Sequence, residues 1–151
     1  MTAEITVRPV RSGDRDGWEP LWQGYLAFYK ATLASDVTEA TWRRFFDPLE
    51  RLGAFVAERD QRLIGFAHYL LHRSTWAPVC YCYLEDLFVD PSARGSGAGR
   101  ALIAAVEAAS REAGASRLYW MTDEHNLTAQ RLYDKVAERP GFVQYRKALK
   151  S

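Results

Sequence analysis

The hydrophobic and polar positions of this chain follow two patterns, one typical of strands and one typical of helices. Alternating or continuous apolar runs bounded by turn residues indicate strands, whereas apolar residues three and four apart indicate amphipathic helices. The patterns predict strands over residues 4–10, 53–59, 62–71, 81–89, 117–122 and 142–149, and helices over 15–33, 36–46, 98–113 and 126–136. The resulting order, β-α-α-β-β-β-α-β-α-β, predicts a mixed α/β (α+β) fold with a mainly antiparallel central sheet flanked by helices.

The first expected helix has a wide aromatic face. Its large side chains recur at spacings of three and four, at Trp18, Leu21, Trp22, Tyr25, Phe28 and Tyr29. Core packing accounts for most of them, because such a stripe is typical of a helix that covers a sheet. Tyrosine also carries a polar group beside its ring, so Tyr25 and Tyr29 are candidates for the wall of a pocket that binds a cation.

Composition narrows the class of protein. The chain has 151 residues, of which 48% are hydrophobic, so we expect a single domain over residues 1–151 with a core of its own. The formal net charge of +1 argues against nucleic acid as the main partner. The longest apolar runs are too short to span a membrane, and no signal peptide is visible at the N-terminus. These observations favour a cytoplasmic protein with no membrane partner.

The cysteines and histidines do not indicate a metal site. Cys80 and Cys82 are two apart in an expected strand, where side chains share one face, and the pattern favours two packed thiols over a disulfide. No other cysteine offers metal-ligand spacing. His68 and His72 fall in or just after a strand, and nothing near them completes a triad or a metal site. We therefore expect no bound metal and a structural role for both histidines.

A glycine-rich loop follows the strand over 81–89 and leads directly into a helix. The turn dipeptide Asp90-Pro91 ends the strand, and the loop then runs through Arg94, Gly95, Ser96, Gly97, Ala98, Gly99 and Arg100. Strand, glycine loop and helix together present free backbone N–H groups and a positive helix end to an anion. Glycine lets the backbone approach a phosphate closely, and the two arginines add positive charge at the edges of the loop.

Two common phosphate loops do not fit this sequence. A nucleotide P-loop needs Gly-Lys followed by Ser or Thr, but here Gly99 is followed by Arg100 and Ala101. A dinucleotide fingerprint needs GxGxxG, and its third glycine falls on Arg100 or on Leu102 in the two possible registers. No acid stands at 115–120 to bind a ribose hydroxyl.

The pattern that does fit is Arg-x-x-Gly-x-Gly, at Arg94, Gly97 and Gly99, directly after a hydrophobic strand end. This loop resembles the acyl-CoA pyrophosphate loop of the GNAT N-acetyltransferase superfamily, whose order of elements also matches the expected one. The alternative is a plain glycine turn between strand and helix. The resemblance implies that acetyl-CoA is bound by the strand end and the loop, at Leu87, Phe88, Val89, Arg94, Gly95, Ser96, Gly97, Ala98, Gly99 and Arg100.

A second stretch, from Asn126 to Lys135, resembles another signature of the family, Asn-x-x-Ala-x-x-Leu-Tyr-x-Lys. The resemblance implies that Asn126 contacts the pantetheine arm and that the Tyr133 hydroxyl lies near the sulfur of coenzyme A. The alternative for Tyr133 is a buried helix aromatic. One departure from the family is that Gly141 and Phe142 come late, after the extra residues 137–140, which puts the alignment of the last strand in doubt.

Within the superfamily, residues 84–89 (LEDLFV) and 120–126 (WMTDEHN) are most similar to the diamine and polyamine acetyltransferases and their HPA-type histone-acetylating relatives. This resemblance implies an acceptor that is a primary amine of a diamine, a polyamine or a lysine-like group. It also implies a homodimer. Two further functions stay open, namely a protein lysine acetyltransferase and a non-catalytic acyl-CoA-binding module.

Acetyl transfer to an amine needs a base, an oxyanion donor and an acid for the leaving thiolate. Glu85 is the candidate base, through water, because it is the acid on the strand beside the loop and burial would raise its pKa. Tyr133 is the candidate acid, and a backbone N–H near Leu87 is the candidate oxyanion donor. Cys82 could carry the acetyl group in two steps, but no base is placed to activate it. We therefore expect direct attack in a ternary complex.

Four acids are expected at the mouth of the acceptor site, namely Glu85, Asp86, Asp123 and Glu124. In a regular strand Asp86 would face away from Glu85. A site lined by these acids, with Tyr25 and Tyr29 as an aromatic wall, would attract cations and repel carboxylates. The competing interpretation is that the acids form ion pairs with arginines such as Arg94 and Arg117 and never meet substrate.

Overall fold

The computed structural model describes residues 4–149, whose contacts divide the chain into two compact units, one ending at Met121 and one beginning at Thr122. The first unit contains β1 (Thr6–Pro9), α1 (Arg15–Phe28), α2 (Ser35–Arg44), β2 (Leu52–Arg59), β3 (Arg62–Arg73), β4 (Cys80–Val89), α3 (Ala98–Glu112) and β5 (Arg117–Tyr119). The second unit contains α4 (Leu127–Val136). Within the described residues, no helix is long and apolar enough to cross a membrane.

The five strands of the first unit form one sheet in the order β1-β2-β3-β4-β5. The first four pair antiparallel, and β5 pairs parallel to β4, which confirms the expected mainly antiparallel sheet. The hairpin between β2 and β3 turns at Asp60 and Gln61, whose φ angles are +53° and +62°. Two consecutive positive φ angles suit the twist of a short hairpin, so the turn expected at these residues is present.

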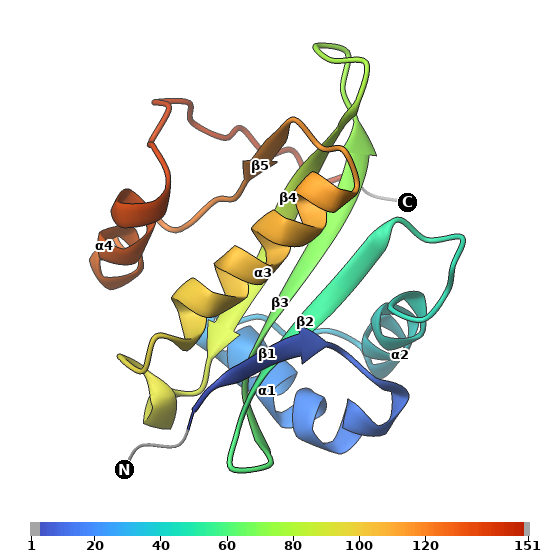
Figure 1. Cartoon of the computed structure of the whole chain (residues 1–151), viewed down its shortest axis with the longest axis vertical. Coiled ribbons are helices and arrows are strands. Elements are labelled where there is room, and N and C mark those ends of the chain that lie inside the picture. The colour runs from blue at the N-terminus through green and yellow to red at the C-terminus, as the bar shows by residue number, and fades with distance from the viewer. Residues whose placement is uncertain (1–3, 150–151) are drawn as a thin grey trace. The chain divides into compact units, whose positions relative to one another are not determined.

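Helices cover both faces of this sheet (Figure 1). Helix α3 buries Leu102 and Val106 completely against one face. Helix α1 lies against the other face with the aromatic stripe that the sequence predicts. Its core cluster comprises Trp18, Leu21, Trp22, Leu26, Trp42, Val56, Phe66 and Phe88. The stripe therefore serves mainly to pack α1 and α2 onto the sheet.

Helix α1 differs from its expected bounds at its C-terminal end. It was expected to reach Leu33 but ends at Phe28, because Lys30 adopts a left-handed φ of +54° that a helix cannot continue through. At the other end Asp14 occupies the N-cap position, but its carboxylate binds Arg8 instead of capping the helix.

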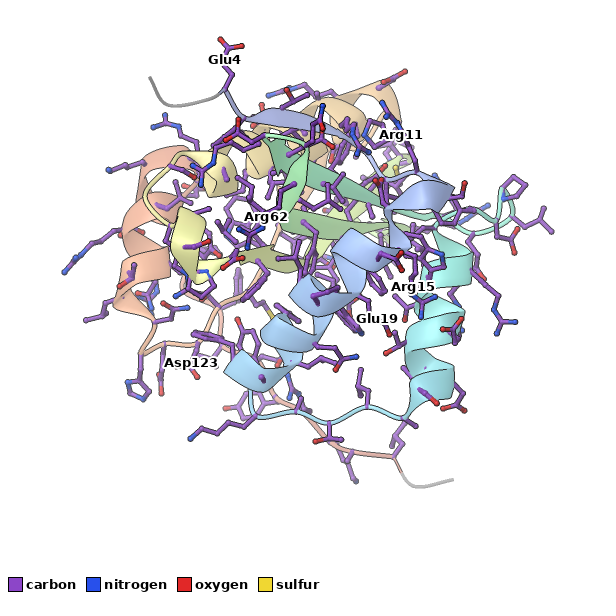
Figure 2. All side chains as sticks on the ribbon, turned by 90° about the horizontal axis from the view of Figure 1, so that it is seen from below. Glu4, Arg11, Arg15, Glu19, Arg62 and Asp123 are labelled. Carbon is purple, nitrogen blue, oxygen red and sulfur yellow. The ribbon has the colours of Figure 1, made fainter. Side chains whose placement is uncertain are left out.

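Charged side chains connect α1 to its neighbour α2. Arg15 and Glu19 lie on the side of α1 that faces α2 (Figure 2), and the Arg15 guanidinium forms ion pairs with Glu19 and with Glu39 of α2. The same guanidinium lies over the rings of Trp18 and Trp42, 5.8 and 5.6 Å from their centroids. Arg15 therefore covers the solvent side of the aromatic core.

The prediction of a strand over residues 142–149 was wrong, because these residues have no regular secondary structure. Helix α4 ends at Val136, and Gly141 then takes a positive φ of +85°. Alternating residues form a strand only when a neighbouring strand accepts their backbone hydrogen bonds, and within the described residues none pairs with this segment. Its apolar side chains are exposed, at Phe142, Val143, Tyr145 and Leu149. Strand β5 is also shorter than expected and ends at Tyr119.

Candidate functional site

The centre of the candidate site is an irregularity in strand β4 at Glu85. Across the ladder between β3 and β4, His68 pairs with Asp86 and the next residue, Tyr69, pairs with Leu84. Glu85 therefore has no partner and is the extra residue of a β-bulge. A bulge bends the strand and redirects its side chains, and bulges are frequent beside active sites.

The bulge reverses the alternation of side chains along β4. Before it, Cys80 contacts the Ala113 carbonyl at the end of α3, and Cys82 contacts Ser110 of α3. After it, Asp86 contacts Tyr25 of α1, on the opposite face of the sheet. Simple alternation would have kept all even-numbered residues on one face. The bulge is the reason that Asp86 joins the α1 side.

A chain of hydrogen bonds runs through the α1 face and ends at Asp86. The indole N–H of Trp18 donates to Nε2 of His68 at 3.0 Å, and Nδ1 of His68 lies 2.9 Å from Oδ2 of Asp86. The hydroxyl of Tyr25 donates to Oδ1 of Asp86 at 2.7 Å. An indole can only donate, so Nε2 of His68 must accept and Nδ1 must carry the proton. Asp86 then accepts from both partners as a carboxylate.

The carboxylate of Asp86 also acts on its titratable neighbours. Burial and the adjacent Asp86 charge raise the pKa of Tyr25, which keeps its hydroxyl protonated as a donor. Partial burial, followed by repulsion from Asp86, raises the pKa of Glu85 above the ordinary carboxyl value. The bulge thus places a readily protonated carboxyl beside a carboxylate whose two oxygens are held by hydrogen bonds.

The glycine loop comes directly after β4 and begins α3. Asp90 accepts a hydrogen bond from the Ser92 N–H at 3.1 Å, in a short 3₁₀ turn over Pro91–Ala93. Gly95 and Gly97 then have positive φ angles of +78° and +91°, and a Cβ built at either position meets nothing within 4 Å. Gly97 is the N-cap of α3 and supplies no side-chain cap. A helix start with free space at its two glycines fits a pyrophosphate, although the Ala98 N–H donates to the Ser96 hydroxyl at 3.4 Å.

The two arginines of this loop have different surroundings. Arg94 donates to the Val89 carbonyl at 3.4 Å, and its guanidinium lies 5.8 and 6.0 Å from the ring centroids of Phe28 and Phe88. These contacts hold Arg94 close to the end of β4. Arg100 is exposed in the first turn of α3. Both can contribute positive charge to an anion at the helix start.

Strand β5 leaves the second half of β4 uncovered on its outer edge. The parallel pairing of the two strands ends at Tyr83 and Tyr119, whose rings stack with centroids 5.0 Å apart. Strand β4 continues to Val89, and no further strand of the described residues pairs with it on this side. Glu85 and the residues after it, including Leu87, Phe88 and Val89, therefore belong to an edge that opens beside the glycine loop.

The arginines named as competitors for the acids are engaged elsewhere. Arg117 lies over the ring of Tyr81, 4.5 Å from its centroid, and Arg94 binds the Val89 carbonyl. Within residues 4–149 neither guanidinium forms an ion pair with Glu85 or Asp86, and the partners of Asp86 are His68 and Tyr25. The interpretation that these two acids are neutralised by Arg94 and Arg117 is therefore wrong.

The two candidate aromatic wall residues differ in environment. Tyr25 is half-buried in the hydrogen-bonded chain, whereas Tyr29 is 47% exposed at the C-terminal end of α1. Their rings make an edge contact, with centroids 5.0 Å apart. Cys82 is buried on the α3 face, and burial raises the pKa of its thiol. Its position across the sheet from Asp86 disfavours a covalent route through this cysteine.

The remaining predicted residues belong to the second unit. Asn126 is the N-cap of α4, and its side chain accepts from the Ala129 N–H at 3.2 Å, which leaves its amide NH₂ available to donate elsewhere. Tyr133 lies within α4. Asp123 accepts from the His125 N–H at 2.8 Å, and Glu124 lies 3.4 Å from the His125 imidazole. Both acids are exposed in the turn that precedes α4.

Sequence reasoning missed His68 and Trp18 as members of the site. The pattern of a single histidine in a strand favoured a structural role, and Trp18 belonged to the packing stripe of α1. The spacing of seven residues between Trp18 and Tyr25 places both on one helix face. That spacing is the one signal in the sequence that the two side chains lie in one region, and it does not indicate which strand residues they contact.

The sequence of this chain is also similar to those of known proteins. The chain matches the profile of the Acetyltransferase (GNAT) family over residues 18–137. D-amino-acid N-acetyltransferase HPA3 of Saccharomyces cerevisiae is 38% identical over 145 residues, covering 95% of this chain and 90% of that protein. The uncharacterized N-acetyltransferase YhfO of Bacillus subtilis is 30% identical over 143 residues, covering 93% of this chain and 95% of that protein.

A solved structure shows the same fold at lower sequence identity. AAC(6')-Iy, in complex with the bisubstrate analog CoA-S-monomethyl-acetylneamine, aligns with a TM-score of 0.83 at 22% identity. The alignment covers 97% of this chain and all of that one.

Proposed function

Because the chain belongs to the GNAT acetyltransferase family, we propose that it transfers the acetyl group of acetyl-CoA to a primary amine that binds beside Glu85 and Asp86. The family assignment makes the chain an acetyltransferase with acetyl-CoA as its cosubstrate. The choice of acceptor rests on one observation. Two adjacent acids stand at the bulge of an open strand edge, and no arginine neutralises them within the described residues.

The proposed reaction is direct attack by the amine in a complex that holds both substrates. Acetyl-CoA supplies the acetyl group, and its sulfur leaves. Glu85 accepts the proton of the substrate ammonium, through water, and its raised pKa makes it a better base than an ordinary carboxylate. A backbone N–H near Leu87 stabilises the oxyanion, and Tyr133 protonates the thiolate.

The proposed cosubstrate site follows the open N-terminus of α3. The pyrophosphate accepts hydrogen bonds from the backbone of the loop, because Gly95 and Gly97 leave that backbone uncovered. Asn126 supplies a contact to the pantetheine arm. The complete set of proposed contacts is Leu87, Phe88, Val89, Arg94, Gly95, Ser96, Gly97, Ala98, Gly99, Arg100, Asn126 and Tyr133.

The proposed acceptor is a cationic amine of a polyamine, a diamine or a lysine-like group. Glu85 and Asp86 attract the ammonium, and the rings of Tyr25 and Tyr29 form a wall next to Asp86. Asp123 and Glu124 are proposed to attract the same cationic amine. A cluster of acids lowers the affinity for substrates with a carboxylate next to the amine. The proposal places the chain in the polyamine and HPA-type subgroup, and the identity to HPA3 supports only the HPA-type part of this placement.

A second acceptor class has its own support. The relative that is 38% identical is named a D-amino-acid N-acetyltransferase, and such a substrate carries a carboxylate beside its amine. D-lysine contains an acceptor of each class, because it has an α-amine beside a carboxylate and a distant cationic ε-amine. The position at which D-lysine becomes acetylated therefore distinguishes the two proposals within one molecule.

The experiment is a screen of acceptors with acetyl-CoA that follows release of the free thiol. Acceptors should include spermidine, an aminoglycoside, D-lysine, D-alanine and a lysine-containing peptide, with products identified by mass spectrometry. We expect spermidine and the ε-amine of D-lysine to have the highest kcat/KM. Preference for D-alanine and for the α-amine would favour the amino-acid class. Turnover of the peptide alone would favour a protein acetyltransferase, and tight acetyl-CoA binding without any turnover would favour a non-catalytic module.

Two further parts of the proposal concern the cellular compartment and the oligomeric state of the enzyme. Cys80 and Cys82 are free thiols, which supports a reducing, cytoplasmic compartment. We propose a homodimer from the family resemblance. We also propose that the ligand of the acceptor site is a small-molecule amine. Sedimentation equilibrium over a range of concentrations tests the dimer, and a monomer at all concentrations would contradict it.

A further inference from the structure

We propose that His68 is a positioning residue, which Trp18 holds in the tautomer that donates from Nδ1 and which thereby aims the Asp86 carboxylate at the acceptor amine. This inference rests on the proposed function, because it assigns a task to Asp86 in that reaction. Sequence reasoning placed His68 among structural residues, and its ring does not reach solvent. It is 3% exposed, so it acts through Asp86 and does not touch the substrate.

The tautomer follows from the donors on each side of the imidazole. Trp18 presents an N–H to Nε2 at 3.0 Å, and a proton on Nε2 would place two donors against each other. With Nε2 accepting, the one proton of the neutral ring lies on Nδ1 and points at Oδ2 of Asp86, 2.9 Å away. The negative charge of the pair therefore stays on Asp86.

The surroundings of His68 strengthen this arrangement. Aromatic rings enclose the imidazole, with centroids 4.4 Å away for Phe66, 4.7 Å for Phe45 and 5.4 Å for Trp22. Such apolar surroundings make each hydrogen bond stronger and make an unpaired polar group costly. The carboxylate of Asp86 is consequently held at both oxygens, by His68 from β3 and by Tyr25 from α1.

The charged and titratable groups near Asp86 are few. The titratable groups in contact with Asp86 or next to it are Tyr25, His68 and Glu85, and Tyr29 contacts the Tyr25 ring. Arg15 lies on the other side of Trp18 and forms ion pairs with Glu19 and Glu39. The residues of α2 and its C-terminal turn that pack against this region, Trp42 and Phe45, do not titrate. Loss of the His68 donor therefore acts mainly on Asp86.

The test compares His68→Leu with His68→Asn and with Thr38→Val. Leucine removes the donor to Asp86 and also leaves the Trp18 indole without its acceptor. Thr38→Val is the matched control, because it leaves the buried indole of Trp22 without its acceptor, 3.0 Å away in the native protein, and does not touch Asp86. Asparagine at 68 restores an N–H at the position of Nδ1 and serves as the conservative variant.

We expect His68→Leu to raise the KM for the amine by about 10-fold or more, as is typical when a charged group loses a hydrogen bond, with the KM for acetyl-CoA within about twofold. His68→Asn should recover most of the affinity, and Thr38→Val should leave the amine KM unchanged. Equal effects of His68→Leu and Thr38→Val would show a structural role only and would overturn the proposal.

A measurement without turnover separates this proposal from the proposed function. Nitrogen-15 NMR of labelled histidine distinguishes the two neutral tautomers from the imidazolium, and His68→Asn assigns the signal. We expect the Nδ1–H tautomer at pH 7 in the native protein. The Nε2–H tautomer or an imidazolium would overturn the proposal even if amines are acetylated, whereas the expected tautomer without acetylation of any amine would contradict the proposed function alone.

Discussion

The hydroxyl of Tyr25 lies 2.7 Å from Oδ1 of Asp86 and joins the aromatic helix α1 to the bulged strand β4. In the proposed function, this bond makes Tyr25 a part of the acceptor site as well as of the core. Tyr25→Phe keeps the ring and removes the donor from Asp86, so we expect the amine KM to rise about 3–30-fold with little change in acetyl-CoA affinity. Steady-state kinetics check this, with the exposed Tyr145→Phe as the control. An unchanged amine KM would show that Tyr25 serves only in core packing.

Gly97→Asp tests the cosubstrate loop. The change puts a side chain and a negative charge at the open start of α3, so we expect loss of acetyl-CoA binding with the fold retained. Calorimetry measures the affinity, and circular dichroism checks the fold. Gly114→Asp is the matched control, because Gly114 also has a positive φ, +82°, with nothing within 4 Å of its Cβ position, but follows the other end of α3. Unchanged affinity in folded Gly97→Asp would show that the loop does not bind the pyrophosphate.

Glu85→Gln tests the base. The pKa of Glu85 is raised by partial burial and by Asp86, and a base acts only when deprotonated. We therefore expect native kcat/KM to fall as the pH drops through a pKa above the ordinary glutamate value of about 4.3. Glu85→Gln should lower kcat by about 10²-fold or more and abolish this acidic limb, and it should also raise the KM for the cationic amine.

The pH–rate profile of Glu107→Gln provides the control for that experiment. Glu107 is an exposed glutamate of α3 that pairs with Arg111, far along the chain from the bulge. Its profile should match that of the native enzyme. Retention of the acidic limb in Glu85→Gln would show that another group produces this limb and that Glu85 is not the base.

Tyr133→Phe tests the proposed acid. The variant keeps the ring on α4 and removes the hydroxyl, so we expect kcat to fall about 10–10³-fold, within the range of losing a positioned proton donor. The affinity for acetyl-CoA should change little. Kinetics and calorimetry on the same preparations separate the two effects. Native turnover in Tyr133→Phe would assign this tyrosine to helix packing.

Asp14→Asn tests an electrostatic contact that supports the fold and not the chemistry. Arg8 binds Asp14 at 2.8 and 3.0 Å and Glu58 at 2.9 Å, which joins β1, the start of α1 and β2. The Arg8 hydrogen bond, the largest cause, lowers the pKa of Asp14. The stabilisation from this shift is fully present above the unfolded-state value of about 3.9 and is lost as the pH falls through the lower folded-state pKa.

We therefore expect Asp14→Asn to reduce the free energy of unfolding by about 1–3 kcal/mol at pH 7. The difference from the native protein should shrink as the pH falls below about 4 and should vanish below the lowered folded-state pKa of Asp14, where both side chains are neutral. Urea denaturation across this range provides the measurement. Asp16→Asn, at an exposed position in the first turn of α1, should change little at any pH. A constant difference at all pH values would argue against the ion pair as the cause.

Local patterns in the sequence were sufficient to predict most elements and the glycine loop before α3. The turn at Asp60, the cap at Asn126 and the C-terminal stop of α3 at Gly114 all depend on residues close in sequence, and all are present. The glycine loop is also local, because its positive φ angles and the open helix start depend on a few consecutive residues. Such features can be predicted because their free energies depend on neighbours along the chain.

Only the tertiary structure decided how the residues of the proposed acceptor site are arranged and whether residues 142–149 form a strand. The bulge at Glu85 depends on how β4 aligns with β3, and it places Asp86 on the α1 face, whereas regular alternation would place it on the α3 face with Cys82. His68 meets Trp18, 50 residues away along the chain, only after α1 has packed onto the sheet. The segment over 142–149 alternates like a strand, yet a strand needs a partner that the alternation does not specify. In each case the deciding interaction joins residues that are distant in sequence, where a one-dimensional pattern holds no information about register.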